Sequence, residues 1–213
     1  VIIDGSVSCF NIINLKHSIK TIFTFLKILS LIEIPYFDLI IATNKKPIIL
    51  SCGNDTTSSL NNKSILWQAL ASVLFEEKYY KCNLKDCLLY ALNLKSLNLA
   101  KKTFTFVLTD GLFDEDDTNS LYNLISFLEE NDISIYGVGL GAFPEKVKTI
   151  FSKAIWAKNP NNLLNALSVF YGDEITHNGS SYIEPVSPKV DWEKGKIIDD
   201  LQEIGQNIHN YIT

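Results

Sequence analysis

The chain opens with the stretch Val1-Ile2-Ile3-Asp4-Gly5-Ser6-Val7-Ser8, in which a short apolar run leads into an acid and two hydroxyls. An unbroken run of Val and Ile is typical of a buried parallel strand. Ligands of open α/β sheets bind beyond the carboxyl ends of the strands, which makes Asp4, Ser6 and Ser8 candidate ligand residues. One carboxylate and two hydroxyls suit a hard cation such as Mg²⁺. The same residues are equally compatible with an Asx or ST turn before a helix, with the hydroxyls bonded to backbone amides.

Apolar periodicity along the rest of the chain predicts strands that alternate with helices. After the opening strand, strands are expected at 36–42, 47–50, 103–109, 133–139 and 154–156, and helices at 14–32, 64–75, 84–97, 119–130, 144–151 and 160–170. The tight turn before Pro47 makes the strands on either side of it antiparallel, and the proline indicates an edge position. The pattern predicts a doubly wound α/β fold: a mostly parallel six-stranded sheet with one antiparallel edge strand and helices on both faces.

The sequence divides into three parts. Residues 1–171 form the expected α/β domain, and the Gly-, Ser- and Pro-rich stretch 172–191 has the composition of a linker. Apolar residues repeat on one face of 192–213, which predicts an amphipathic C-terminal helix that packs on the domain or on a partner. Because the chain begins without Met and directly in a strand, we expect it to be part of a larger protein or complex.

Composition excludes some classes of partner. The formal net charge of −5, without a lysine-rich stripe, argues against nucleic-acid binding. No apolar run is long enough for a membrane span. The cysteines have no metal-binding spacing and are expected to be free, buried or half-buried thiols: Cys9, Cys52, Cys82 and Cys87. The lack of an obvious disulfide pair slightly favours a cytoplasmic location, whereas three glycosylation sequons favour an extracellular one, so the compartment stays open.

Two distant loops add candidate ligands to the opening stretch. Asp110 follows the strand 103–109, and Ser64 is the first residue of the helix expected at 64–75. If the first and fourth strands are neighbours, Asp4 and Asp110 lie side by side, where they repel unless a cation separates them or one is protonated. The expected metal ligands are Asp4, Ser6, Ser8, Ser64 and Asp110. This oxygen-only set suits Mg²⁺ or Mn²⁺ and lacks the His or Cys that zinc prefers.

These motifs resemble those of the von Willebrand factor A (vWA) domain, whose metal-ion-dependent adhesion site (MIDAS) combines Asp-x-Ser-x-Ser, a later Thr, and Thr/Ser-Asp-Gly. Asp4 to Ser8 matches the first part, and Thr109-Asp110-Gly111 matches the last. Ser64 stands where the family usually has Thr, with Thr56 or Thr57 as the alternative. The stretch 135–141 is similar to the family's fifth strand and its glycine loop. The resemblance covers about residues 1–171.

The resemblance implies a non-enzymatic protein–protein interaction or adhesion module. In such sites Ser6 and Ser8 would coordinate the ion directly, Asp4 and Asp110 directly or through water, and Ser64 when ligand binds. An open position on the ion would take an Asp or Glu carboxylate of a partner protein. Two alternatives stay open: a Mg²⁺-dependent phosphotransferase or phosphatase with Asp4 as nucleophile, and a vWA-like scaffold that has lost metal binding.

Overall fold

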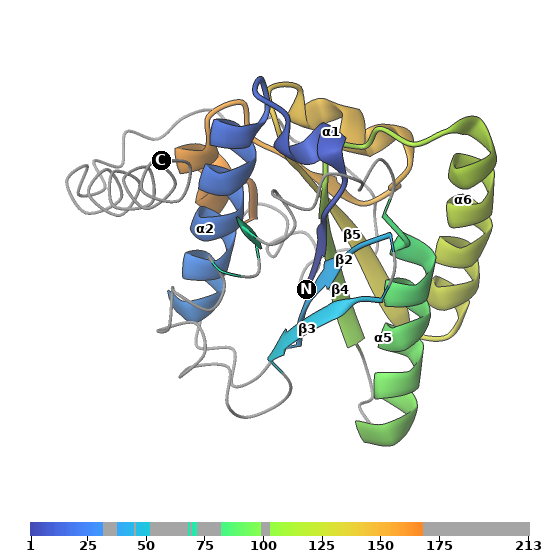
Figure 1. Cartoon of the computed structure of the whole chain (residues 1–213). Coiled ribbons are helices and arrows are strands. Elements are labelled where there is room, and N and C mark those ends of the chain that lie inside the picture. Colours follow the sequence, from blue (N-terminus) through green and yellow to red (C-terminus); the bar gives the residue numbers. More distant parts are fainter. Residues whose placement is uncertain are drawn as a thin grey trace.

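A computed structural model describes residues 1–31, 38–44, 46–51, 68, 70–71, 82–98 and 103–167. In this part of the chain a single sheet runs through the molecule with helices on either side (Figure 1). Of the helix expected at 64–75, only Gln68, Leu70 and Ala71 are described, and all three are helical. The expected linker 172–191 and C-terminal helix 192–213 lie outside the described residues.

The sheet has six strands in the order β3-β2-β1-β4-β5-β6. Their bounds are β1 Ile2–Asp4, β2 Leu39–Ala42, β3 Ile48–Ser51, β4 Thr103–Thr109, β5 Ile133–Gly139 and β6 Ala154–Ile155. Neighbouring strands are parallel except β2 and β3, which are antiparallel, so β3 is the antiparallel edge strand that the turn before Pro47 predicts. This arrangement confirms the predicted fold class. The strands before β4 extend the sheet to one side of β1, and the strands from β4 onward extend it to the other side, so the boundary between β1 and β4 is the topological switch point.

Strand alternation divides the buried residues into two cores, one on each face of the sheet. Ile3 and the residues of β2, β4 and β5 that point to the same face of the sheet pack with α2 (Leu15–Leu31) and the helical residues 163–167. Ile2 and its counterparts pack with α5 (Leu84–Asn98) and α6 (Glu115–Glu130). Figure 1 shows α2 on one side of the strands and α5 and α6 on the other. Both faces of β1 are therefore buried, which fixes the position of Asp4 at its end.

Four helical segments differ from expectation. A short helix, α1 (Val7–Phe10), follows β1 where only a loop was expected. The helix α6 begins at Glu115 rather than at 119, with Asp114 as its N-cap residue, because acidic residues are favourable in the first turn of a helix. The segment Pro144–Thr149 is a 3₁₀ helix (η2), as is Pro160–Asn162 (η3), which the helical residues 163–167 continue.

Within the described part of the chain, no helix combines the length and the apolar character needed to cross a bilayer.

Candidate functional site

Asp4 lies at the carboxyl end of β1 and is held by three donors. The Thr109 hydroxyl donates to its Oδ2 at 2.6 Å, and the backbone N–H of Ser6 donates to Oδ1 at 2.9 Å. The Cys82 thiol donates to the same Oδ1, also at 2.9 Å. The side chain is 1% exposed. Both oxygens are thus bonded and oriented by residues from three separate segments of the chain.

Ser6 and Ser8 place their hydroxyls side by side at the start of α1, with the two Oγ atoms 3.1 Å apart. Ser6 is the N-cap residue of α1 but makes no side-chain capping bond. The turn interpretation of this stretch therefore holds for the Asp4 carboxylate, which accepts from the Ser6 amide, and fails for the Ser6 hydroxyl. That hydroxyl instead faces Ser8 and the Cys9 sulfur.

Asp110 follows β4 and carries a buried oxygen without a partner. Its Oδ1 accepts from the backbone N–H of Leu112 at 3.1 Å, whereas its Oδ2 is buried and has no hydrogen-bond donor. Burial first, and the Asp4 charge second, raise the pKa of the Asp110 carboxyl above its ordinary value. Within the described residues no lysine pairs with either carboxylate. A cation would supply the missing partner and would relieve the repulsion between Asp4 and Asp110.

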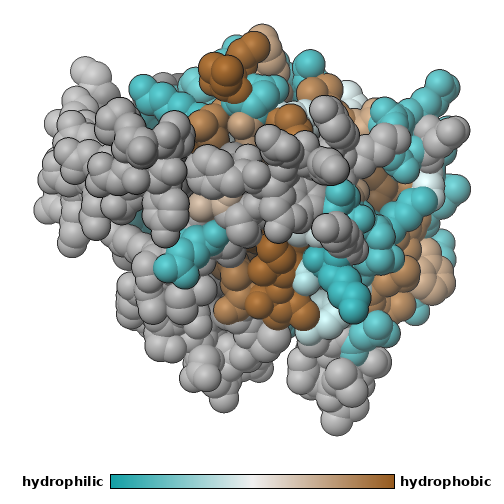
Figure 2. Space-filling view, in the orientation of Figure 1, coloured by the Kyte–Doolittle hydropathy of each residue, from teal (hydrophilic) through white to brown (hydrophobic). Residues whose placement is uncertain are grey.

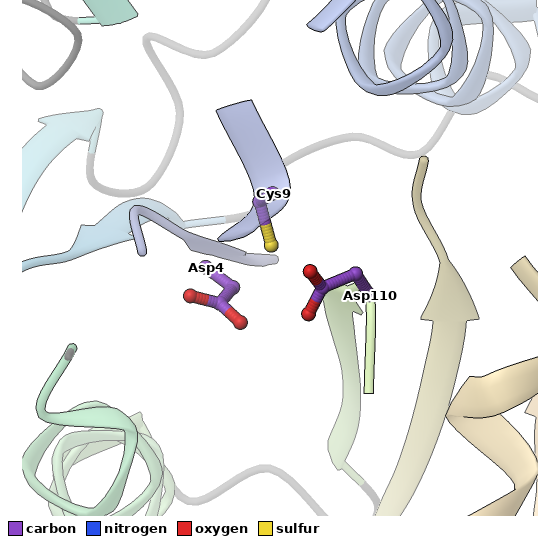
Figure 3. Close-up of side chains that lie close together, drawn as sticks. All are labelled: Asp4, Cys9 and Asp110. Atoms are coloured by element: carbon purple, nitrogen blue, oxygen red, sulfur yellow. The ribbon is translucent and has the colours of Figure 1, made fainter. Parts of the chain in front are cut away.

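Cys9 is a site residue that the sequence analysis did not select. Its thiol is fully buried and points toward the space between the two carboxylates (Figure 3). One ligand atom each of Asp4, Cys9 and Asp110 lie within 4.8 Å of one another. Burial and the two carboxylate charges raise the pKa of the Cys9 thiol well above its ordinary value. Cys9 thus lies beside the expected oxygen ligands, and the spacing of the cysteines in the sequence does not indicate this proximity.

The described cysteines otherwise behave as expected. Cys9 and Cys87 are buried free thiols, and Cys82 is a half-buried one, so the prediction of free thiols is confirmed for these three. Cys52 lies outside the described residues.

The loop after β4 is shaped by Thr109 and Gly111. The Thr109 hydroxyl, which donates to Asp4, also accepts from the Gly111 amide at 3.2 Å. Gly111 has a φ of +73°, and a Cβ there would lie 2.7 Å from the carbonyl carbon and oxygen of Lys146. Glycine is therefore required at this position both by its backbone conformation and by the close approach of η2. Together these contacts fix Asp110 relative to Asp4.

Asn14, in the loop between α1 and α2, ties Ser8 to the loop after β5. Its Nδ2 donates to the carbonyl of Ser8 at 2.7 Å, and its Oδ1 accepts from the amide of Ala142 at 3.0 Å. Gly141, with a φ of +80°, lies against the same side chain. No sequence motif marks Asn14, because its role depends on two loops that are distant in the sequence.

The structure brings together four of the five expected ligands: Asp4, Ser6 and Ser8 from the segment after β1, and Asp110 from the segment after β4. The fifth, Ser64, and the alternatives Thr56 and Thr57 lie outside the described residues. Two facing carboxylates, two hydroxyls and one buried oxygen without a donor are chemically suited to a divalent cation.

Comparisons with known proteins identify the fold. No protein-family model matches the sequence, and no curated protein matches it either. Among solved structures, the chain is similar to the N-terminal domain of TFIIH p34, with a TM-score of 0.52 and 14% identity over 78% of this chain and 93% of that one. It is also similar to proximal thread matrix protein 1 of the mussel byssus, with a TM-score of 0.51 and 16% identity over 79% of this chain and 43% of that one.

A further likeness, to the VWA domain of SpRpn10, has a TM-score of 0.47 and 14% identity over 79% of this chain and 92% of that one. Identities of 14–16% are evidence for a shared fold alone, and that evidence comes from the two structures with TM-scores above 0.5. The mostly parallel six-stranded sheet, its antiparallel edge strand and the helices on both faces agree with the fold predicted from the sequence. The chain has a vWA-like fold.

Proposed function

We propose that the chain is a non-enzymatic protein-interaction module that binds Mg²⁺ or Mn²⁺ and captures an Asp or Glu carboxylate of a partner protein. The observation that carries this proposal is the pair of buried carboxylates, Asp4 and Asp110, of which one oxygen has no donor. Asp4, Ser6, Ser8 and Asp110 would hold the ion, and Ser64 would join them when ligand binds. The bound ion would supply an exchangeable position that a partner carboxylate can fill.

The surface around the site supports an interaction with protein. Five exposed apolar side chains come from the loops and short helix at this end of the sheet, and they define what we name the apolar rim: Val7, Ile12, Ile13, Leu112 and Phe143. In Figure 2, brown atoms gather at the end of the molecule where α1 lies in Figure 1. A polar site surrounded by exposed apolar side chains is typical of an interface in which a polar contact is enclosed by apolar ones.

The bonding of Asp4 supports a binding role over a nucleophilic one. Its two oxygens accept three hydrogen bonds, and the side chain is 1% exposed. Each of those bonds stabilises the carboxylate and lowers its reactivity toward an electrophile. Release of phosphate from a phosphomonoester, lost in Asp4→Asn, would instead favour the phosphotransferase alternative.

Selection from random peptides tests the proposal. Peptides displayed on phage would be bound in Mg²⁺ and eluted with EDTA, with the Asp4→Ala variant as the bait for counter-selection. The proposal predicts binders that share an Asp or Glu and lose binding when it becomes Asn or Gln. Binders that persist in EDTA, or that lack an acidic residue, would contradict it. Phe143→Ala should lower the affinity for the selected peptides about tenfold or more, because exposed aromatic side chains dominate many interfaces. It should leave the affinity for the ion unchanged.

A further inference from the structure

We propose that the same site has a second, thiophilic mode of binding, in which Cys9 joins Asp4 and Asp110 to hold Zn²⁺ or a similar ion. This inference goes beyond the proposed function and does not depend on it. The site contains two ligand sets that share the same pair of carboxylates: a hard set completed by hydroxyl oxygens and a soft set completed by a sulfur.

The position of Cys9 carries the proposal. Its sulfur belongs to a group of three ligand atoms, with one oxygen each of Asp4 and Asp110, that lie within 4.8 Å of one another. Ligands on a single tetrahedral zinc ion, with bonds of about 2.0–2.3 Å, lie about 3.6 Å apart. The three side chains therefore need to approach by about an ångström, which small side-chain rotations can supply. Figure 3 shows the sulfur directed toward the two carboxylates rather than away from them.

A second observation points independently to a ligand. Asp110, 3% exposed, has a buried Oδ2 without a hydrogen-bond donor, and its carboxyl group is directed toward Asp4 and Cys9 (Figure 3). A buried carboxylate oxygen without a donor is costly, and a cation at this point removes the cost. The group thus offers an unsatisfied oxygen, a second carboxylate and a thiol to one ion.

The choice of ion follows from ligand chemistry. Mg²⁺ takes oxygen ligands in a near-octahedral shell and gains little from sulfur. Zn²⁺ binds sulfur and carboxylate oxygen in four-coordinate sites and binds such ligand sets more tightly than Mg²⁺ or Mn²⁺ does. On coordination the thiol releases its proton to solvent, and the Zn–S bond forms without any change of oxidation state. The soft ligand set should therefore favour Zn²⁺ or Co²⁺, and the hard set Mg²⁺ or Mn²⁺.

The test uses Co²⁺ as a spectroscopic probe and Zn²⁺ in competition with a chromophoric chelator. Wild type should show a sulfur-to-cobalt charge-transfer band at one equivalent of Co²⁺. Cys9→Ser should lose the band and bind Zn²⁺ at least about 100-fold more weakly, because even residues that only support a metal ligand are worth 10–100-fold. Cys87→Ala is the matched control, since Cys87 is an equally buried thiol in α5, and it should keep both properties.

A band that persists in Cys9→Ser, or its absence in wild type, would overturn the proposal. If Cys9→Ser fails to fold, X-ray absorption of the Zn²⁺-loaded Cys82→Ser variant decides, because Cys82 is the other thiol beside Asp4. At least one sulfur at about 2.3 Å supports the proposal, and oxygen or nitrogen neighbours alone refute it. Failure here is distinguishable from failure of the proposed function, because the proposed function is tested with Mg²⁺ and displayed peptides on wild type, and this proposal with Co²⁺ and Zn²⁺.

Discussion

Replacing Asp110 by Asn should stabilise the protein without a divalent ion and abolish its stabilisation by Mg²⁺. The substitution keeps an oxygen that can accept from the Leu112 amide and removes one of two buried like charges. Two unit charges 4.8 Å apart repel by about 3.5 kcal/mol at an effective dielectric constant of about 20. Structural relaxation and partial protonation reduce this value, so we expect a gain of about 2 kcal/mol in the free energy of unfolding.

The result should reverse when the ion is present. In EDTA the gain corresponds to a rise of about 4–8 °C in melting temperature for a domain of this size. In Mg²⁺ at about 1,000 times its dissociation constant, wild type gains about 4 kcal/mol because the ion binds only the folded state. The variant gains nothing, so wild type becomes the more stable protein.

Thermal unfolding of both proteins in EDTA and in Mg²⁺ measures this reversal. Asp114→Asn is the matched control, because it makes the same charge change at an exposed N-cap position where Asn and Asp are equally favourable. The control should follow wild type in both buffers. A variant no more stable than wild type in EDTA would refute the repulsion, and one that keeps the Mg²⁺ shift would show that Asp110 does not hold the ion.

Three further predictions concern residues that shape the site or lie beside it. Thr109→Val should lower the free energy of unfolding by about 1–3 kcal/mol, because it leaves the buried Oδ2 of Asp4 without its 2.6 Å donor. Urea unfolding measures this loss. Thr105→Val, in the same strand, should lower the free energy of unfolding by less, and equal losses for the two variants would argue against a special role of Thr109. Gly111→Ala should destabilise the protein by at least about 1–3 kcal/mol in urea unfolding, since it combines a positive φ with a clash against η2; a loss below about 0.5 kcal/mol would contradict the described loop. Burial, chiefly, raises the pKa of the Cys87 thiol from 9.0 to about 12, so its contribution to stability is complete below pH 9.0 and is lost as the pH rises toward 12. At pH 8 iodoacetamide should alkylate Cys87 about 1,000-fold more slowly in the folded than in the urea-unfolded protein, as peptide mass spectrometry can measure, and equal rates would contradict this pKa.

Sequence periodicity predicted the sheet well because both faces of its central strands are buried. The predicted bounds of β4 and β5 agree with the structure at every residue. β4 is a continuous run of apolar, β-branched and aromatic residues, and β5 has such residues interrupted only by Ser134 and by glycine. The start of α6 was placed too late, because its first turn is acidic and lacks the apolar periodicity by which helices are found in sequence.

The candidate site was only partly predictable from sequence. Asp4 and Asp110 could be placed together because parallel strands end at the same edge of a sheet. Cys9, Cys82 and Asn14 could not be, since nothing in their local sequence indicates which loops they contact. The hydrogen bond from Thr109 to Asp4 depends on the register between β1 and β4, which pairs Ile3 with Leu108 and which the sequence alone does not specify.

The most direct test of a cation site at Asp4 and Asp110 is a crystal of the chain grown with Mn²⁺ and measured near the manganese absorption edge. We expect one anomalous difference peak per chain, in contact with side-chain oxygens from the group Asp4, Ser6, Ser8 and Asp110. A map without a peak at this position at millimolar Mn²⁺, in a crystal where these residues are ordered, would contradict a cation site here and leave the alternative of a vWA-like scaffold without a metal.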